Sequence, residues 1–200
     1  MQKTKFDILE STCIPLPVEN IDTDQIIPAR FLTATSRDGF GQNLFRDWRF
    51  DKSGNKVESF VLNDTSFTGQ VLVAGKNFGC GSSREHAVWA ISDYGFRVVV
   101  SSFFADIFMN NALNNGLLPV VVPEDYLTDL LELIKIEPKT MVSIDLERQT
   151  FSILSSGKSV RFEISPFKKE CLMKGLDDVD YLLAIKEQIT AYEFRNTLKG

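Results

Sequence analysis

Short apolar runs alternate with helical patterns through the middle of the chain, and this alternation restricts the possible folds most strongly. Each run ends in turn residues, as strands do, and the intervals between runs space their apolar residues as helices do. The runs occupy 70–75, 96–100 and 117–122; helices are expected from Ser83 to about Tyr94, before a C-cap at Gly95, and over 101–116. Strand, helix, strand, helix, strand is the order of parallel βαβ units. The sequence therefore predicts an α/β fold with a parallel core.

The flanking segments predict additions to this core. Residues 60–63 resemble a further short strand, and a polar helix is expected over about 124–135. Three apolar segments separated by short turns predict a small antiparallel meander, at 141–147, 150–154 and 160–165. A C-terminal helix is expected to start at Asp177 or Asp178 and to continue through 194. No linker or internal repeat divides the sequence, so we expect a single domain over residues 1–200.

Residues 31–59 contain glycines and polar clusters without a sustained hydrophobic period. They predict a long loop, and long loops in compact domains are often functional. Apolar side chains in this loop are candidates for selecting the side chain of a ligand: Phe31, Leu32, Phe40, Leu44 and Trp48.

Charge, hydropathy and cysteine spacing exclude several classes of protein. With 27 acidic and 22 scattered basic residues, a nucleic acid is not an expected partner. No apolar run approaches the roughly 18–20 residues of a membrane span, and no signal-peptide core is present, so we expect a cytoplasmic protein without membrane contact. Cys13, Cys80 and Cys171 are far apart and lack CxxC spacing, so we expect neither disulfides nor a metal site on this chain.

Residues 75–91 place three glycines, two serines and the only histidine of the chain just before a helix. Strand, glycine-rich loop, helix is the layout of phosphate-binding motifs. However, Asn77 stands where a P-loop has Ser or Thr, and Arg84 stands where a dinucleotide fingerprint has its third glycine. Neither serine satisfies G-x-S-x-G, and His86 lies on the same helical turn, badly placed to be their base. Nucleotide and hydrolase motifs are therefore not supported.

Two interpretations of this stretch remain. Ser82 and Glu85 match a capping box, in which each side chain bonds a backbone N–H at the helix start. Alternatively, the helix start attracts an anion, because its unpaired N–H groups carry about half a positive charge. Gly79 and Gly81 would let a ligand approach the backbone, and the planar guanidinium of Arg84 suits a carboxylate. The second interpretation predicts a carboxylate-binding site.

Asp22, Thr23 and Asp24 open a second polar stretch, residues 20–32. A calcium loop is not supported, because the sixth and twelfth positions from Asp22 lack the required glycine and glutamate. Taken alone, the stretch predicts a turn with two solvated acids, followed by a strand, with Arg30 on the surface.

Together, the two polar stretches resemble the small-subunit family of 3-isopropylmalate dehydratase, in the aconitase superfamily. The resemblance is carried by residues 22–32, followed by 77–91 and 95–120. Residues 39–50 and 171–183 are similar to the longer bacterial form of this subunit.

The resemblance implies an aconitase-type swivelling domain, of β/β/α type, made as a separate polypeptide. A larger partner subunit would carry a [4Fe-4S] cluster, whose iron would act as a Lewis acid on a departing hydroxyl. The implied reaction converts 2-isopropylmalate to 3-isopropylmalate through 2-isopropylmaleate, by loss and return of water, in leucine biosynthesis. The active site would lie between the two chains.

The resemblance also implies roles for residues 79–84, which we call the serine loop. Ser82 would be the base that takes a proton from carbon, and Ser83 and Arg84 would contact a substrate carboxylate. Gly81 would bind substrate through its backbone. A serine alkoxide needs stabilisation, which the backbone N–H groups of 79–83 could supply; losing one such donor typically costs about 10²- to 10³-fold in rate.

Roles in the other stretch follow in the same way. Asp24 would orient a catalytic group of the partner, Thr23 beside it would bind substrate, and Arg30 would grip the substrate. Structural or supporting roles are expected for Asn77 and His86. The alternatives are the small subunit of a related split hydro-lyase, such as homoaconitase or a methylmalate-type dehydratase, and a non-catalytic dicarboxylate-binding module.

Overall fold

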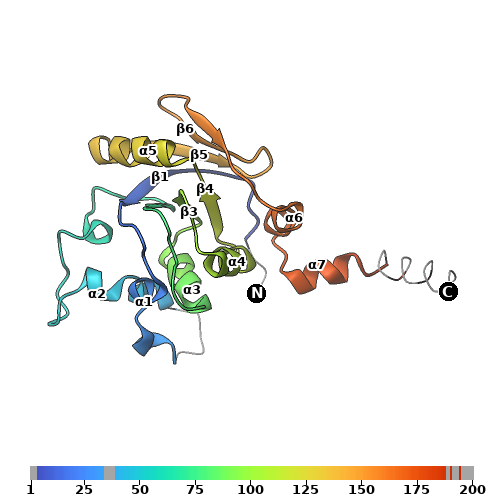
Figure 1. The fold of residues 1–200 in the computed structure, drawn as a ribbon, viewed down its shortest axis with the longest axis horizontal. Helices are drawn as coiled ribbons and strands as arrows, with labels where there is room; N and C mark the ends of the chain where they lie inside the picture. Colours follow the sequence, from blue (N-terminus) through green and yellow to red (C-terminus); the bar gives the residue numbers. More distant parts are fainter. Residues whose placement is uncertain (1–3, 34–38, 188–189, 191–193, 195–200) are drawn as a thin grey trace.

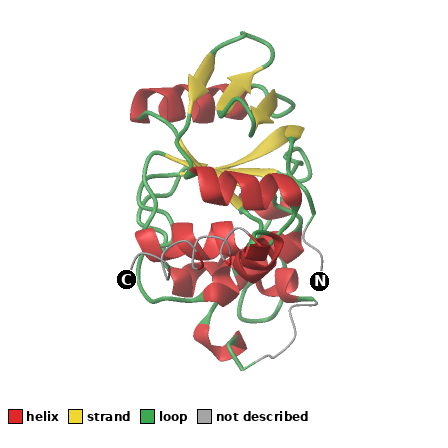
Figure 2. Ribbon diagram, turned by 90° about the vertical axis from the view of Figure 1, so that its right-hand side faces the viewer, coloured by secondary structure: helices red, strands yellow, loops and turns green. Residues whose placement is uncertain are grey.

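A sheet of seven strands runs through the described part of the protein (Figures 1 and 2). The computed structural model describes residues 4–33, 39–187, 190 and 194. The strand order is β4-β3-β2-β1-β5-β6-β7. The strands are β1 Ile8–Leu16, β2 Val71–Ala74, β3 Val98–Ser101, β4 Leu118–Val121, β5 Met141–Asp145, β6 Thr150–Ile153 and β7 Ser159–Arg161.

Helices of different lengths connect these strands. The longer helices are α3 Glu85–Tyr94, α4 Asp106–Asn114, α5 Glu124–Ile136, α6 Pro166–Lys174 and α7 Asp178–Ala184. The shorter helices are α1 Thr23–Ile26 and α2 Arg46–Arg49, with 3₁₀ turns η1 Ala29–Phe31, η2 Phe40–Asn43 and η3 Val61–Asn63.

Strand β1 joins a parallel half of the sheet to an antiparallel half. Its residues 13–16 pair in parallel with β2, and β2, β3 and β4 continue in parallel. Its residues 8–12 pair antiparallel with β5, and β6 and β7 complete a meander. The predicted parallel βαβ core and antiparallel meander are both confirmed.

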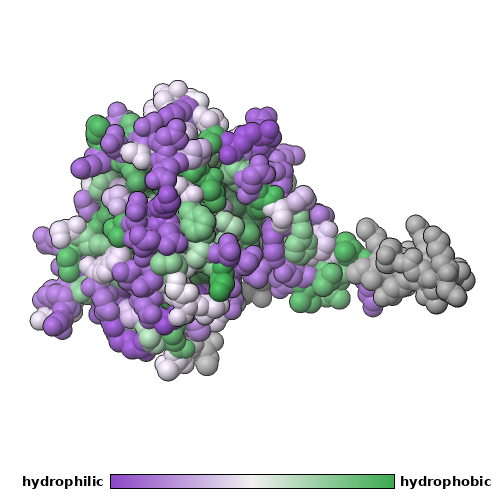
Figure 3. Space-filling model, in the orientation of Figure 1, coloured by the Kyte–Doolittle hydropathy of each residue, from purple (hydrophilic) through white to green (hydrophobic). Residues whose placement is uncertain are grey.

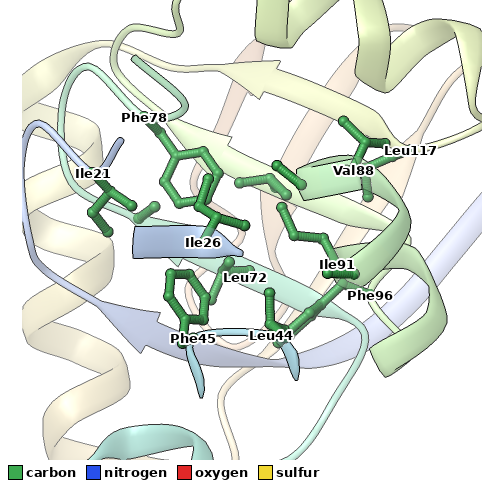
Figure 4. Packing of buried hydrophobic residues seen from close by; sticks show 14 of the residues in the cluster. Ile21, Ile26, Leu44, Phe45, Leu72, Phe78, Val88, Ile91, Phe96 and Leu117 are labelled. Atoms are coloured by element: carbon green, nitrogen blue, oxygen red, sulfur yellow. The ribbon is translucent and has the colours of Figure 1, made fainter. Parts of the chain in front are cut away.

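Helices cover both faces of the parallel half. Leu72 and Ala74 of β2 pack with α1, α3 and α4, whereas Val71 and Val73 face α5, because successive strand residues point to opposite sides. Figure 4 shows side chains of α1 and α3 gathered around Leu72. Strands covered on both faces are apolar throughout, which explains the unbroken runs in the sequence.

Strand β1 and helix α6 have no counterpart in the sequence-based prediction. Glu10 and Pro15 interrupt the apolar pattern of β1, and proline argues against an interior strand. Pro15 is tolerated because it lies in the half that pairs with β2, beyond the residues that pair with β5.

Residues 60–63 are not a strand. Val61–Asn63 form the turn η3, and Leu62 is 9% exposed in the core cluster of α1 and α3. The apolar character of this segment therefore serves packing rather than strand pairing.

A strand after Asp24 is also absent from this described stretch. Asp22 accepts a hydrogen bond from the Gln25 backbone N–H, and the Gln25 side chain accepts one from the Asp22 N–H. This capping box starts the short helix α1, which ends before Pro28. The spacing of Asp22 and Gln25 was visible in the sequence as a cap signal.

The described part of 31–59 has no strand but contains the turn η2 and the short helix α2, so the expected long loop is partly helical. Residues 34–38 lie outside the described residues. Several apolar side chains of this segment are less accessible to a ligand than expected. Phe40 and Leu44 are 3% and 0% exposed, and Trp48 stacks on the buried Phe45 ring at a centroid distance of 5.4 Å. Phe40 and Leu44 are therefore core residues and not the ligand contacts we expected.

The C-terminal helix begins as predicted. The Asp177 side chain caps α7 by accepting from the Asp180 N–H at 2.7 Å. Helix α7 extends away from the sheet and carries exposed apolar side chains (Figures 1 and 3). Within the expected continuation to 194, residues 188, 189 and 191–193 lie outside the described residues. No helix in the described ranges has the length and apolar character needed to cross a membrane.

Candidate active site

The two polar stretches lie side by side at the carboxyl ends of β1 and β2. The Asn20 N–H donates to the Lys76 carbonyl at 2.8 Å, and the Gly79 N–H donates to the Ile21 carbonyl at 2.8 Å. A parallel bridge then joins Asp22 to Cys80. The crevice beyond the carboxyl ends of parallel strands is where ligands commonly bind in α/β proteins.

Asn20 and Asn77 connect the two stretches near the strand ends. Both have positive φ, 56° and 61°, which asparagine tolerates better than most residues. The Asn77 amide donates to the Asn20 side-chain oxygen at 2.8 Å. These contacts support a structural role for Asn77.

Gly79 and Gly81 have different reasons to be glycine. At Gly79, with φ of 76°, an added Cβ would lie 2.2 Å from Cγ of Phe108 on α4. Its bare backbone therefore admits this ring rather than a ligand. At Gly81, φ is 90° and the nearest atom to an added Cβ, Cβ of Asp22, is 3.4 Å away. Gly81 is exposed, so its backbone remains accessible to a ligand.

The capping box expected from Ser82 and Glu85 is wrong. Helix α3 begins at Glu85 with Arg84 as its N-cap, and no described side chain caps it. Glu85 instead accepts from the Asn115 amide at 2.9 Å. Ser82 and Ser83 precede the helix, and both are exposed. Neither serine therefore caps the helix, and both remain exposed to solvent.

Arg84 forms an ion pair with Asp24. Its Nη1 donates to Asp24 Oδ1, and the side chains are 16% and 54% exposed. The guanidinium is therefore fixed beside the serine loop, while the carboxylate faces outward. The expected role of Asp24 toward a partner is not tested by this contact, which is made within the chain.

Thr23 is buried between the two stretches, at 2% exposure. Its backbone N–H donates to the Cys80 carbonyl at 3.0 Å, and its hydroxyl donates to the Ser82 carbonyl at 3.0 Å. A hydroxyl so placed contacts the loop rather than an incoming ligand.

Arg30 lies with a different group of residues. Its guanidinium pairs in a bidentate manner with Asp47, with Nη1 at 3.0 Å from Oδ2. This hydrogen bond lowers the pKa of Asp47 and raises the pKa of Arg30. Both line an open hollow of about 1250 Å³, whose other walls come from residues 31, 42, 43, 46 and 49–54, and Ser82 is not among them. Thus the described structure does not bring Arg30 into contact with the serine loop.

His86 packs among aromatic rings. Its ring centroid is 4.4 Å from Trp89 and 5.6 Å from Phe40. These contacts support the structural role expected from its place on α3.

The cysteines do not form a site that fits an iron–sulfur cluster. Cys13 is in β1, Cys171 is in α6, and the Cys80 thiol donates to the Asn20 carbonyl at 3.4 Å. Burial raises the pKa of the Cys13 thiol, which opposes the thiolate that a metal requires. No group of three or more His, Cys, Asp or Glu among the described residues could hold a metal.

Ser101 supports the loop in a way that sequence reasoning missed. It is fully buried, and its hydroxyl lies 2.7 Å from the Gly75 carbonyl and 2.9 Å from the Phe103 carbonyl. These contacts tie the end of β3 to the start of the loop after β2. Only its position at the end of an apolar run could have indicated this role.

Comparisons with known proteins agree with this architecture. Residues 3–125 match the aconitase C-terminal domain family. The chain is 58% identical to the 3-isopropylmalate dehydratase small subunit of Christiangramia forsetii, over 94% of this chain and 92% of the relative. It is 57% identical to the protein of that name from Azobacteroides pseudotrichonymphae, over 94% of this chain and 96% of the relative.

A solved structure is similar over nearly its whole length. The crystal structure of 3-isopropylmalate dehydratase from Methanocaldococcus jannaschii superposes with a TM-score of 0.66 at 30% sequence identity. The match covers 93% of this chain and 99% of that chain.

Proposed function

The chain belongs to the aconitase C-terminal domain family, among the small subunits of 3-isopropylmalate dehydratase, and from this we propose how it works. It is one part of a hydro-lyase that converts 2-isopropylmalate to 3-isopropylmalate through 2-isopropylmaleate, in leucine biosynthesis. The whole of residues 1–200 serves as one swivelling domain. The observation that carries this function is the loop of the exposed Ser82 and Ser83 and the partly buried Arg84, at the carboxyl ends of two parallel strands.

Ser82 is the residue that takes the proton from carbon in this proposal. Ser82 is exposed and lies two residues before Arg84, the N-cap of α3. Positive charge and backbone N–H groups favour the alkoxide that proton abstraction requires. Ser83, Arg84 and the Gly81 backbone bind a substrate carboxylate in this proposal. Gly81 and Ser83 are exposed, and Asp24 holds the Arg84 guanidinium next to them.

Asp24 and Arg30 each pair with another side chain of this protein. The Asp24 carboxylate holds Arg84 and is half exposed, so it could also meet a group of a partner. Arg30 would reach substrate only by leaving Asp47. The 31–59 segment recognises the isopropyl group in this proposal, through Phe31, which lines the hollow beside Arg30.

A partner subunit is required by the openness of this site. Ser82 and Ser83 face solvent, whereas abstraction of a carbon-bound proton needs a site from which water is excluded. The small-subunit relatives imply a large subunit, and we propose that it covers this loop in a heterodimer. The large subunit would also hold the [4Fe-4S] cluster, and loss of the hydroxyl belongs to its residues. We further propose that the complex is cytoplasmic.

The direct test is turnover of 2-isopropylmalate by this chain mixed anaerobically with its large subunit. The wild-type mixture is expected to be active, and Ser82→Gly is expected to abolish turnover without changing folding or assembly. Ser155→Gly, in an exposed turn after β6, is the matched control and should keep wild-type activity. Near-normal turnover by Ser82→Gly would remove Ser82 from the mechanism.

A further inference from the structure

The segment that follows β1 packs against the serine loop and holds it in place through hydrogen bonds. Thr23 contributes two of the contacts, one from its backbone N–H to Cys80 and one from its hydroxyl to the Ser82 carbonyl. The second contact spans 59 positions in sequence. Thr23 is 2% exposed, so the donor of this hydrogen bond is removed from water, while the acceptor belongs to the exposed Ser82.

The contact to Ser82 fixes the direction of a neighbouring donor. The Ser82 carbonyl and the Ser83 N–H belong to one planar trans peptide, in which the two groups point in opposite directions. Because the carbonyl points inward to Thr23, the Ser83 N–H points away from Thr23. In the described part of the chain no acceptor takes this N–H, and Ser83 is exposed.

We propose that Thr23 is a positioning residue, whose hydroxyl orients the Ser82–Ser83 peptide so that Ser82 meets the carbon-bound proton and the Ser83 N–H meets the substrate carboxylate. This inference rests on the proposed function and adds a supporting residue to it. Thr23 does not touch substrate. Loss of its hydroxyl leaves the Ser82 carbonyl without this donor and lets the peptide rotate toward another partner.

Steady-state kinetics of the reconstituted complex test this role. Thr23→Val keeps the size of the side chain and removes the hydroxyl, so kcat should fall about 10- to 100-fold, because small misplacements of a reacting group have effects of this size. KM should change much less, because Arg84 still holds the carboxylate. Thr23→Ser restores the hydroxyl and should restore kcat.

Thr140→Val is the matched control. Thr140 is 4% exposed, and its hydroxyl donates to the Glu137 carbonyl at 2.7 Å, between α5 and β5. It should lose a comparable buried hydrogen bond without losing kcat. A wild-type kcat in Thr23→Val, or an equal loss in Thr23→Ser, would overturn the role of the hydroxyl.

Hydrogen exchange of the isolated chain gives a readout independent of activity. Backbone amides of 79–84 should exchange faster in Thr23→Val than in the wild type, and Thr140→Val should leave them unchanged. Unchanged exchange in Thr23→Val overturns the inference. An inactive wild-type mixture would instead overturn the proposed function, so the two failures are distinguishable.

Discussion

Single side chains in this protein derive their roles from distant neighbours. Thr23 and Asp24 are adjacent in sequence, yet one contacts the Ser82 carbonyl and the other contacts the Arg84 guanidinium. The first is buried and the second is half exposed. Because burial removes competition from water, the Thr23 contact should hold the loop more firmly than the ion pair does.

Gly79 offers a test of packing beneath the loop. Gly79→Ala places a methyl group against the Phe108 ring and keeps a positive φ, so it should lower the free energy of unfolding by about 2–4 kcal/mol. Chemical denaturation measures this change.

Gly54→Ala separates the two causes. Gly54 has φ of 84° and no atom within 4 Å of an added Cβ, so only the backbone cost of about 1–2 kcal/mol is expected. Equal destabilisation of both variants would contradict the contact with Phe108.

Helices and loops show where local patterns predict structure and where they do not. The strands β2, β3 and β4 follow from apolar runs that are covered on both faces. The segment at 60–63 has a similar apolar composition but becomes η3, because its side chains reach the core from outside the sheet. Local composition cannot distinguish these two uses of apolar residues.

The 31–59 segment contains apolar residues that pack in the core and an apolar residue that lines the hollow beside Arg30. Phe40 is a core residue, so Phe40→Ala should lower the free energy of unfolding by about 3–5 kcal/mol without changing substrate preference. Phe31→Ala should instead reduce the preference for 2-isopropylmalate over citramalate, by up to about tenfold. Relative turnover of these substrates by each reconstituted variant measures the difference. A changed preference in Phe40→Ala alone would reverse these assignments.

The molecule as a unit is organised around β1, which belongs to both halves of the sheet. Its Cys13 pairs with Val71 and is 0% exposed in the cluster that faces α5. Exposing this side chain requires β1 to leave β2 or the cluster under α5 to open. The serine loop depends on the same strand, because the segment carrying Thr23 follows β1 directly.

Cys13 should therefore report global unfolding. Its thiol should react with a disulfide reagent only as fast as the whole protein unfolds, both because it is buried and because burial raises its pKa. Cys80, which is partly exposed, should react much faster. In a variant that carries both Cys80→Ser and Cys171→Ser, only the Cys13 thiol can react. Its labelling rate is measured across denaturant concentrations. Fast labelling in native buffer would show that β1 opens locally.

Much of the parallel core and both polar stretches could be predicted from the order of residues, because hydrophobic period, turn residues and motif spacing are local properties. Strand β1 could not, because Pro15 is acceptable only in the place it takes beside β2. The pairing of Thr23 with Ser82, and of Asp24 with Arg84, joins positions 59 and 60 residues apart. Such pairs form because β1 and β2 become neighbours in the sheet, and adjacency of strands is a property of the folded chain rather than of any window of its sequence.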